Sequence, residues 1–199
     1  MTIIFDRSKK ISLDDESFRS ELLSIASKID DVIPLGRGDP DFHTPKHIVD
    51  AAKKALDDNK HHYTPPNGLP ELRFAISKNL LKKYNLNYSE NEIVVTAGVQ
   101  ESIALAMLSL LETGDEVLIT SPRFTTYDLN VRMCNAKPIP IPTYEKNNFS
   151  LMPEIIESKI NERTKVIVLV SPNNPTGAVT PPENIRKIAE IAIKHNLIV

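Results

Sequence analysis

The 199-residue chain is long enough to bury one sizeable core, so we expect one domain or part of one. Its 24 Lys and Arg nearly balance 26 Asp and Glu, and both signs are interspersed, which argues against nucleic acid or an anionic membrane as a partner. No apolar run approaches the ~20 residues that span a bilayer. The lone cysteine, Cys134, cannot form an intrachain disulfide, and no Cys/His spacing resembles a zinc site, so we expect no metal and a cytoplasmic location.

Apolar residues at helical spacing predict a helix over residues 17–29, and the glycine-rich stretch Leu35–Phe42 follows it. Later helices are expected at 45–55, 70–84, 99–111, 126–133 and 180–195, and strands at 92–96, 116–120, 137–141, 166–170 and from 197 onward. The last helix begins with Thr180-Pro181-Pro182-Glu183, which is typical of a capping box.

Strands alternate with helices, and the run Val166–Val170 is apolar on both faces. This pattern predicts an α/β fold with a mostly parallel sheet covered by helices on both faces. A buried strand has only begun at Leu197–Val199, so we expect the chain to be the front part of a longer protein, incomplete at its C-terminus.

Several loops follow strand ends, where open α/β sheets bind ligands. Gly98 precedes a helix whose first N–H groups could hold a phosphate, although a glycine there is often only a turn requirement. The Ser171–Gly177 loop is either a proline–glycine turn or a rigid amide donor. Phe124 could stack on a flat heterocycle or pack in the core, and Tyr63 could belong to a surface turn.

The order of these pieces resembles the class I/II aminotransferases, the fold-type-I enzymes that use pyridoxal 5′-phosphate (PLP). The matching segments are GRGDPDFHTP (36–45), YTPPNGLPELRFAI (63–76), VTAGVQESI (95–103), SPRFTTY (121–127) and SPNNPTGAV (171–179). The resemblance implies an aspartate-aminotransferase-like major domain. Residues 1–45 would then contribute to a small domain, and residues 46–199 would form the first part of the large PLP-binding domain.

The resemblance also implies cofactor-binding residues. Gly98, Val99 and Gln100 match the backbone cradle for the PLP phosphate, and Phe124 matches the ring stacked on the pyridine. Asn174 matches the amide that hydrogen-bonds the 3′ oxygen and contacts the substrate carboxylate.

Two further roles are implied in the first half of the chain. Gly38 matches a backbone position that approaches the substrate. Tyr63 resembles the tyrosine that reaches the phosphate of a neighbouring subunit, which implies a homodimer with shared sites.

The implied activity is transfer of an amino group between an L-amino acid and a 2-oxo acid, with PLP as electron sink. The Schiff-base lysine of the family would come after Val199, so no lysine here is assigned as catalytic and we expect the 199 residues alone to be inactive. Two alternatives stay open: a PLP lyase or synthase of the same fold, and a non-catalytic regulatory module that retains the fold.

Overall fold

The structure is a computed structural model that describes residues 21–22, 24–33, 38 and 40–199. Apart from Glu21, which is grouped with the second, these residues form two compact units, Leu22–Ala97 and Gly98–Val199. Of the helix expected at 17–29, residues 21–22 and 24–26 are helical, and residues 17–20 and 23 lie outside the described part. Within the described ranges, no helix is both long and apolar enough to cross a membrane.

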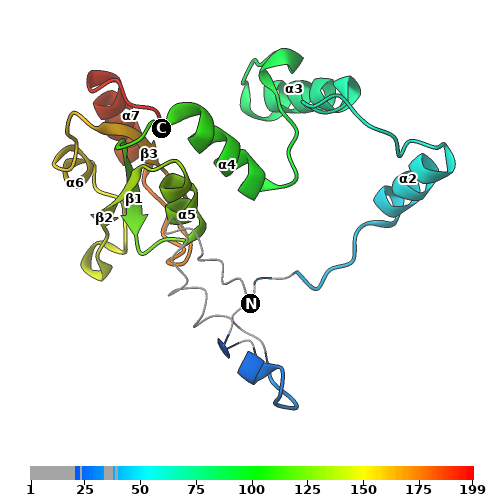
Figure 1. Cartoon of the computed structure of the whole chain (residues 1–199), viewed down its shortest axis with the longest axis horizontal. Coiled ribbons are helices and arrows are strands. Elements are labelled where there is room, and N and C mark those ends of the chain that lie inside the picture. The colour runs from blue at the N-terminus through cyan, green and yellow to red at the C-terminus, as the bar shows by residue number, and fades with distance from the viewer. Residues whose placement is uncertain (1–20, 23, 34–37, 39) are drawn as a thin grey trace, which may run out of the picture. The chain divides into compact units, whose positions relative to one another are not determined.

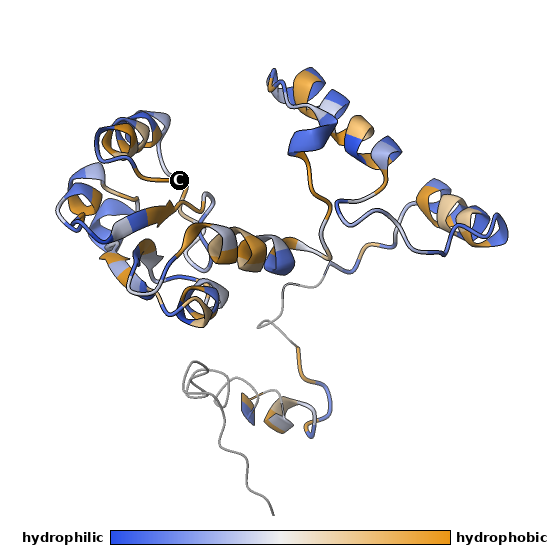
Figure 2. Ribbon diagram, turned by 45° about the horizontal axis from the view of Figure 1, so that its top comes forward, coloured by the Kyte–Doolittle hydropathy of each residue, from blue (hydrophilic) through white to orange (hydrophobic). Residues whose placement is uncertain are grey.

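The Leu22–Ala97 unit contains α2 (Lys46–Asp57), α3 (Pro70–Tyr84) and the short 3-10 helix η1 (Glu90–Glu92). Pro70 lies in the first turn of α3, where its missing N–H would have no acceptor anyway, and Asn85 ends the helix in a left-handed conformation. Hydrophobic and hydrophilic residues are segregated on α2, as Figure 2 shows by colour.

The strand predicted at 92–96 is wrong. Residue 92 ends η1, and residues 93–96 are in no strand. A strand is defined by a ladder of hydrogen bonds to a neighbouring strand. Val95 N donates to Asn67 O at 3.1 Å, a residue of a loop and not of a strand, so a β-branched composition alone did not suffice.

The Gly98–Val199 unit is built on a parallel sheet of β1 (Glu116–Ser121), β2 (Lys137–Pro142) and β3 (Thr164–Val168), in the order β2-β1-β3 (Figure 1). Ile198 adds a parallel bridge to Val166 beside β3. The parallel arrangement predicted from the sequence is confirmed.

Helices cover both faces of this sheet. One face packs against α4 (Val99–Leu110) and α5 (Thr126–Met133), and the other packs against α6 (Pro153–Glu157) and α7 (Pro182–Lys194). Val117 and Ile119 of β1 belong to the first cluster, whereas Leu118 belongs to the second, and all three side chains are fully buried. The doubly covered α/β sheet is therefore confirmed.

The capping box predicted at 180–183 does not form. Helix α7 begins at Pro182 with Pro181 as its N-cap residue and no side-chain capping bond. Thr180 is buried, and its N–H donates to Ser171 Oγ at 3.0 Å. Thr180 is thus held by the preceding loop, one residue before the position that the capping box requires.

Candidate functional site

Strands β1 and β3 are neighbours, but the chain leaves their carboxyl ends toward opposite faces of the sheet. The connection after β1 leads to α5, which packs against Val117 and Ile119. The connection after β3 leads to α7, which packs in the cluster of Leu118. In open α/β sheets, such a divergence between adjacent parallel strands marks the edge at which ligands usually bind.

The start of α4 reaches the same region. Gly98 is the N-cap residue with φ 83° and ψ 171°, a conformation that is essentially restricted to glycine, and a Cβ added there would meet no atom within 4 Å. Gln100 Nε2 donates to Thr126 Oγ1 at 3.1 Å, which joins the first turn of α4 to the first residue of α5. The first N–H groups of a helix have no acceptor within the helix, so Val99 and Gln100, two exposed residues in the first turn of α4, suit an anion.

Phe124 lies in the loop between β1 and α5 and is half-buried. The residue before it, Arg123, donates from Nη1 to Thr120 O at 3.4 Å and from Nε to Asp128 Oδ2 at 2.6 Å. The hydrogen bond to Asp128 raises the pKa of Arg123 above its ordinary value, partly opposed by burial. The loop that presents the Phe124 ring is therefore tied to both β1 and α5.

The two asparagines after β3 have opposite environments. Asn174 is exposed, whereas Asn173 has only 8% of its surface exposed. The Asn173 carboxamide accepts a hydrogen bond from Thr120 Oγ1 at 3.2 Å and donates to Pro122 O at 3.3 Å. It therefore joins the loop after β3 to the loop after β1. The sequence predicted a role for Asn174 and missed Asn173, although two adjacent asparagines are a sign that one can turn inward.

Five of the seven predicted site residues lie within the Gly98–Val199 unit, at or beside the starts of α4 and α5 and in the loop after β3. These are Gly98, Val99, Gln100, Phe124 and Asn174. Their environments fit a planar group with a phosphate arm, because the unit offers a helix N-terminus for the phosphate, an aromatic ring for the plane and an exposed carboxamide for a polar substituent.

The other two predicted residues, Tyr63 and Gly38, belong to the Leu22–Ala97 unit. The side chain of Tyr63 is fully exposed, and it borders a hollow of about 420 Å³ that Lys60, His62 and Leu69 also line. Gly38 is exposed, and a Cβ added there would meet no atom within 4 Å. Its neighbours at 36, 37 and 39 lie outside the described residues.

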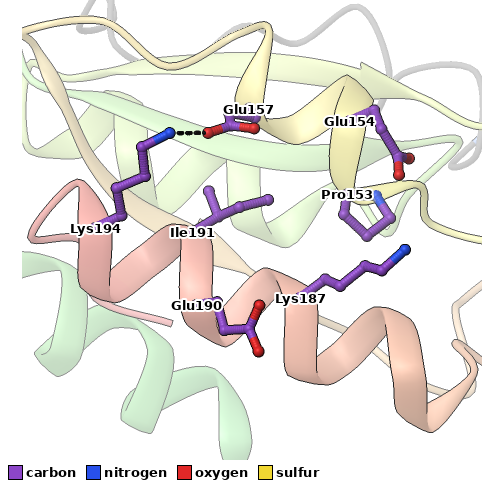
Figure 3. Close-up of a pocket in the computed structure, with 7 residues that line it drawn as sticks. All are labelled: Pro153, Glu154, Glu157, Lys187, Glu190, Ile191 and Lys194. Carbon is purple, nitrogen blue, oxygen red and sulfur yellow. Dashed lines mark hydrogen bonds and ion pairs between the residues drawn. The ribbon is translucent and has the colours of Figure 1, made fainter.

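A separate groove of about 380 Å³ lies between α6 and α7 (Figure 3). Its lining residues are Pro153, Glu154, Glu157, Lys187, Glu190, Ile191 and Lys194. Lys194 Nζ reaches Glu157 Oε1 at 2.7 Å, and this hydrogen bond is the main reason that the pKa of Glu157 lies below its ordinary value. None of the predicted site residues lines the groove, so we do not assign it to the candidate site.

Comparisons with known proteins show which family the chain resembles. Aspartate aminotransferase of Pyrococcus horikoshii is 44% identical over 190 residues, a match that covers 96% of this chain and 49% of that protein. Aromatic-amino-acid aminotransferase 2 of Thermococcus litoralis is 35% identical over 193 residues, covering 96% of this chain and 50% of that protein. The chain thus spans about half the length of these curated relatives.

Among solved structures, aspartate aminotransferase from Thermus thermophilus with maleate matches with a TM-score of 0.89 and 32% identity. The match covers 98% of this chain and 52% of that one. The model of the family "Aminotransferase class I and II" matches residues 30–199. The chain therefore belongs to the class I and II aminotransferase family.

Proposed function

We propose that the full-length protein, meaning this chain with any further residues that its gene encodes, is a PLP-dependent aminotransferase that transfers an amino group between an L-amino acid and a 2-oxo acid. One observation carries the proposal: side-chain hydrogen bonds join the start of α4 to the start of α5, and join the loop that holds Asn174 to the end of β1 and the loop that holds Phe124. Membership of the aminotransferase family supports it.

Each residue in this proposal has a binding or orienting task. The N–H groups of Val99 and Gln100 would hold the phosphate, with Gly98 allowing its close approach. The Phe124 ring would cover one face of the pyridine and so fix its plane. The Asn174 carboxamide would donate to the 3′ oxygen, and Asn174 and the backbone of Gly38 would contact the substrate. PLP, when bound, supplies an electron sink for the bond cleavage beside the amino group.

The proposal includes a homodimer with shared sites, in which Tyr63 reaches the phosphate bound by a second copy of the chain. The complete exposure of the Tyr63 side chain supports this assignment, because the phenol is available to a group outside its own unit. Residues 1–45 would contribute to a small domain and residues 46–199 to the large one. We also propose a cytoplasmic location, which rests on the single cysteine, Cys134.

Aspartate is the amino donor that we propose to test first, because the relative at 44% identity is named an aspartate aminotransferase. An aromatic amino acid is the second candidate, because the Thermococcus litoralis relative carries that name. Neither Lys165 nor Lys194 is proposed as catalytic.

The test is a donor screen on purified full-length protein with PLP and a 2-oxo acid acceptor. The screen measures the new 2-oxo acid and the new amino acid, which transfer of the amino group must produce in equal amounts. Size-exclusion chromatography with light scattering tests the dimer on the same sample. Transfer from at least one amino acid is expected. Failure of the PLP-saturated protein to transfer an amino group from any of the standard L-amino acids would overturn the proposed activity.

A further inference from the structure

The two adjacent asparagines of the Ser171–Gly177 loop divide two tasks between them. Asn174 is exposed and available to a ligand, whereas Asn173 is more than nine-tenths buried and points into the protein. A buried carboxamide is costly unless its donors and acceptor are satisfied. The hydrogen-bond partners of the Asn173 side chain therefore indicate its structural role.

Every polar atom of the Asn173 side chain has a partner. Its Oδ1 accepts from Thr120 Oγ1 at 3.2 Å, and its Nδ2 donates to Pro122 O at 3.3 Å and to Thr176 Oγ1 at 3.0 Å. The carbonyl oxygen of Pro122 can only accept, so the nitrogen of the carboxamide must face it. An aspartate of the same shape would place an oxygen against that carbonyl and could donate neither bond, although the Thr176 hydroxyl could turn to donate to it.

The backbone of Asn173 closes the loop from which Asn174 projects. Asn173 N donates to Ala178 O at 2.9 Å, and Gly177 N donates to Asn173 O at 2.7 Å. Gly177 has φ +71°, which favours glycine and turns the chain back on itself. The segment 173–178 is thus a small closed loop that carries Asn174. The Asn173 side chain joins this loop to Thr120 and Pro122.

The Asn173 side chain is bonded to the residues just before Phe124 in the chain. Thr120 belongs to β1, and Pro122 is two residues before Phe124. Asn173 is therefore hydrogen-bonded to the segment 120–122, which leads into the loop of Phe124. On the other side of this loop, Arg123 is held by Asp128. A shift of the 173–178 loop would therefore change the position of Asn174 relative to Phe124.

We propose that Asn173 is a positioning residue: its buried carboxamide fixes the Asn174 loop against the Phe124 loop, so that the carboxamide and the ring meet the cofactor in one geometry. Asn173 does not itself touch the cofactor. This inference rests on the proposed function, because it concerns residues that would bind PLP.

The experiment compares Asn173→Asp and Asn173→Ala with Asn184→Ala in the full-length protein. Asn184 is a matched control, because its Nδ2 likewise donates to a backbone carbonyl, Leu151 O at 2.9 Å, without reaching either loop. Deuterium uptake of a peptide covering residues 171–179 in the PLP-free protein reports the loop, and equilibrium titration with PLP reports binding.

Both Asn173 variants should take up deuterium about tenfold faster in this peptide and bind PLP about tenfold more weakly, as expected when buried hydrogen bonds are lost. The control should stay within about twofold of the wild type in both measurements. Bound PLP should show the same change of absorbance in Asn173→Ala as in Asn174→Ala, a signature that a loss of stability alone would not produce. The double variant that combines Asn173→Ala with Asn174→Ala should bind PLP no more than about twofold more weakly than Asn174→Ala. Both substitutions remove the same contact, the one between the Asn174 carboxamide and PLP.

Three outcomes would overturn the inference: unchanged uptake and PLP affinity in Asn173→Asp, an equal loss of affinity in the Asn184 control, or additive losses in the double variant. These outcomes presuppose a wild type that binds PLP. A wild type that fails to bind PLP would instead overturn the proposed function and this inference together, so the two failures are distinguishable.

Discussion

The carboxylate of Asp128 and the guanidinium of Arg123 form a two-bonded pair that brackets Phe124. Arg123 Nε lies 2.6 Å from Asp128 Oδ2, and Nη2 bonds the other carboxylate oxygen. Only 18% of the Arg123 side chain and 15% of the Asp128 side chain are exposed. Two-bonded arginine–carboxylate pairs fix direction as well as distance. The pair therefore stabilises the loop geometry that presents the Phe124 ring.

Asp128→Asn should lower the free energy of unfolding by about 2 kcal/mol, because it leaves a poorly exposed guanidinium without its charged partner. The matched control is Lys194→Met, which breaks a pair with Glu157 whose side chains are 67% and 40% exposed. The control should cost clearly less, because an exposed ion pair is screened by solvent and contributes little to stability. Urea unfolding of the full-length protein measures both, and equal losses would show that burial does not distinguish the two pairs.

Glu116 begins β1 at the end of the strand opposite to the candidate site, and only 5% of its surface is exposed. Its carboxylate accepts from Asn161 Nδ2 at 2.7 Å and from Arg163 Nε at 3.1 Å. The pKa of Glu116 lies below its ordinary value of 4.5, chiefly because of the hydrogen bond from Asn161. The folded state therefore favours the charged carboxylate.

This shift gives the acid stability a definite sign. Below its ordinary pKa of 4.5 the unfolded chain binds a proton at Glu116 before the folded chain does, so stability falls as the pH drops through the lowered folded-state pKa. Glu116→Gln should be less stable than the wild type near neutral pH, by about 1–2 kcal/mol, and the difference should shrink in acid. Unfolding free energies measured from neutral pH into acid test this, and parallel curves for the two proteins would contradict it.

Gly68 follows Asn67 in the loop that begins at Tyr63, and it packs directly on Val95. A Cβ added at Gly68 would lie 2.7 Å from Val95 Cβ and Cγ2, at a residue with φ +96°. Gly114 has a similar φ of +94° but open space around it, so it separates backbone strain from the steric clash.

Gly114→Ala should cost about 1–2 kcal/mol, because it adds strain at positive φ alone, and Gly68→Ala should cost about 2 kcal/mol more, because it adds the clash with Val95. Chemical unfolding of both variants measures the difference. A Gly68→Ala variant as stable as Gly114→Ala would show that the loop moves away from Val95 at little cost.

The parallel sheet could be predicted from the sequence, because each of its buried strands is visible as a short run of apolar residues. The run Glu116–Thr120 is buried throughout, and an apolar strand that is covered on both faces leaves few alternatives to a parallel sheet. The segment 92–96 has the same β-branched composition, yet it forms no strand, because pairing depends on a neighbour that composition does not reveal.

The candidate site likewise has residues that could be predicted from the sequence and residues that could not. Gly98 at a helix start follows from the order of residues, and the structure has it as the N-cap of α4. The choice between Asn173 and Asn174 does not follow, because the burial of Asn173 depends on Thr120, which lies 53 residues earlier in the chain. Contacts of that range are set by the strand order, which neighbouring residues do not determine.

Asn174→Ala tests the predicted cofactor contact itself. The Asn174 side chain is exposed, so its truncation should change the free energy of unfolding by less than about 0.5 kcal/mol. If its carboxamide donates to the 3′ oxygen, the variant should bind PLP about tenfold more weakly and change the absorbance of the bound cofactor, because a hydrogen bond to a charged oxygen is lost.

The control is Asn91→Ala, an asparagine of η1 in the other unit that is likewise exposed, which should leave affinity and spectrum unchanged. Titration with PLP, followed by absorbance, gives both quantities on one sample. Wild-type affinity together with a wild-type spectrum in Asn174→Ala would remove this residue from the site. Phe124 and the start of α4 would then have to hold the cofactor without the carboxamide, because Asn173 beside it has both of its N–H groups engaged within the protein.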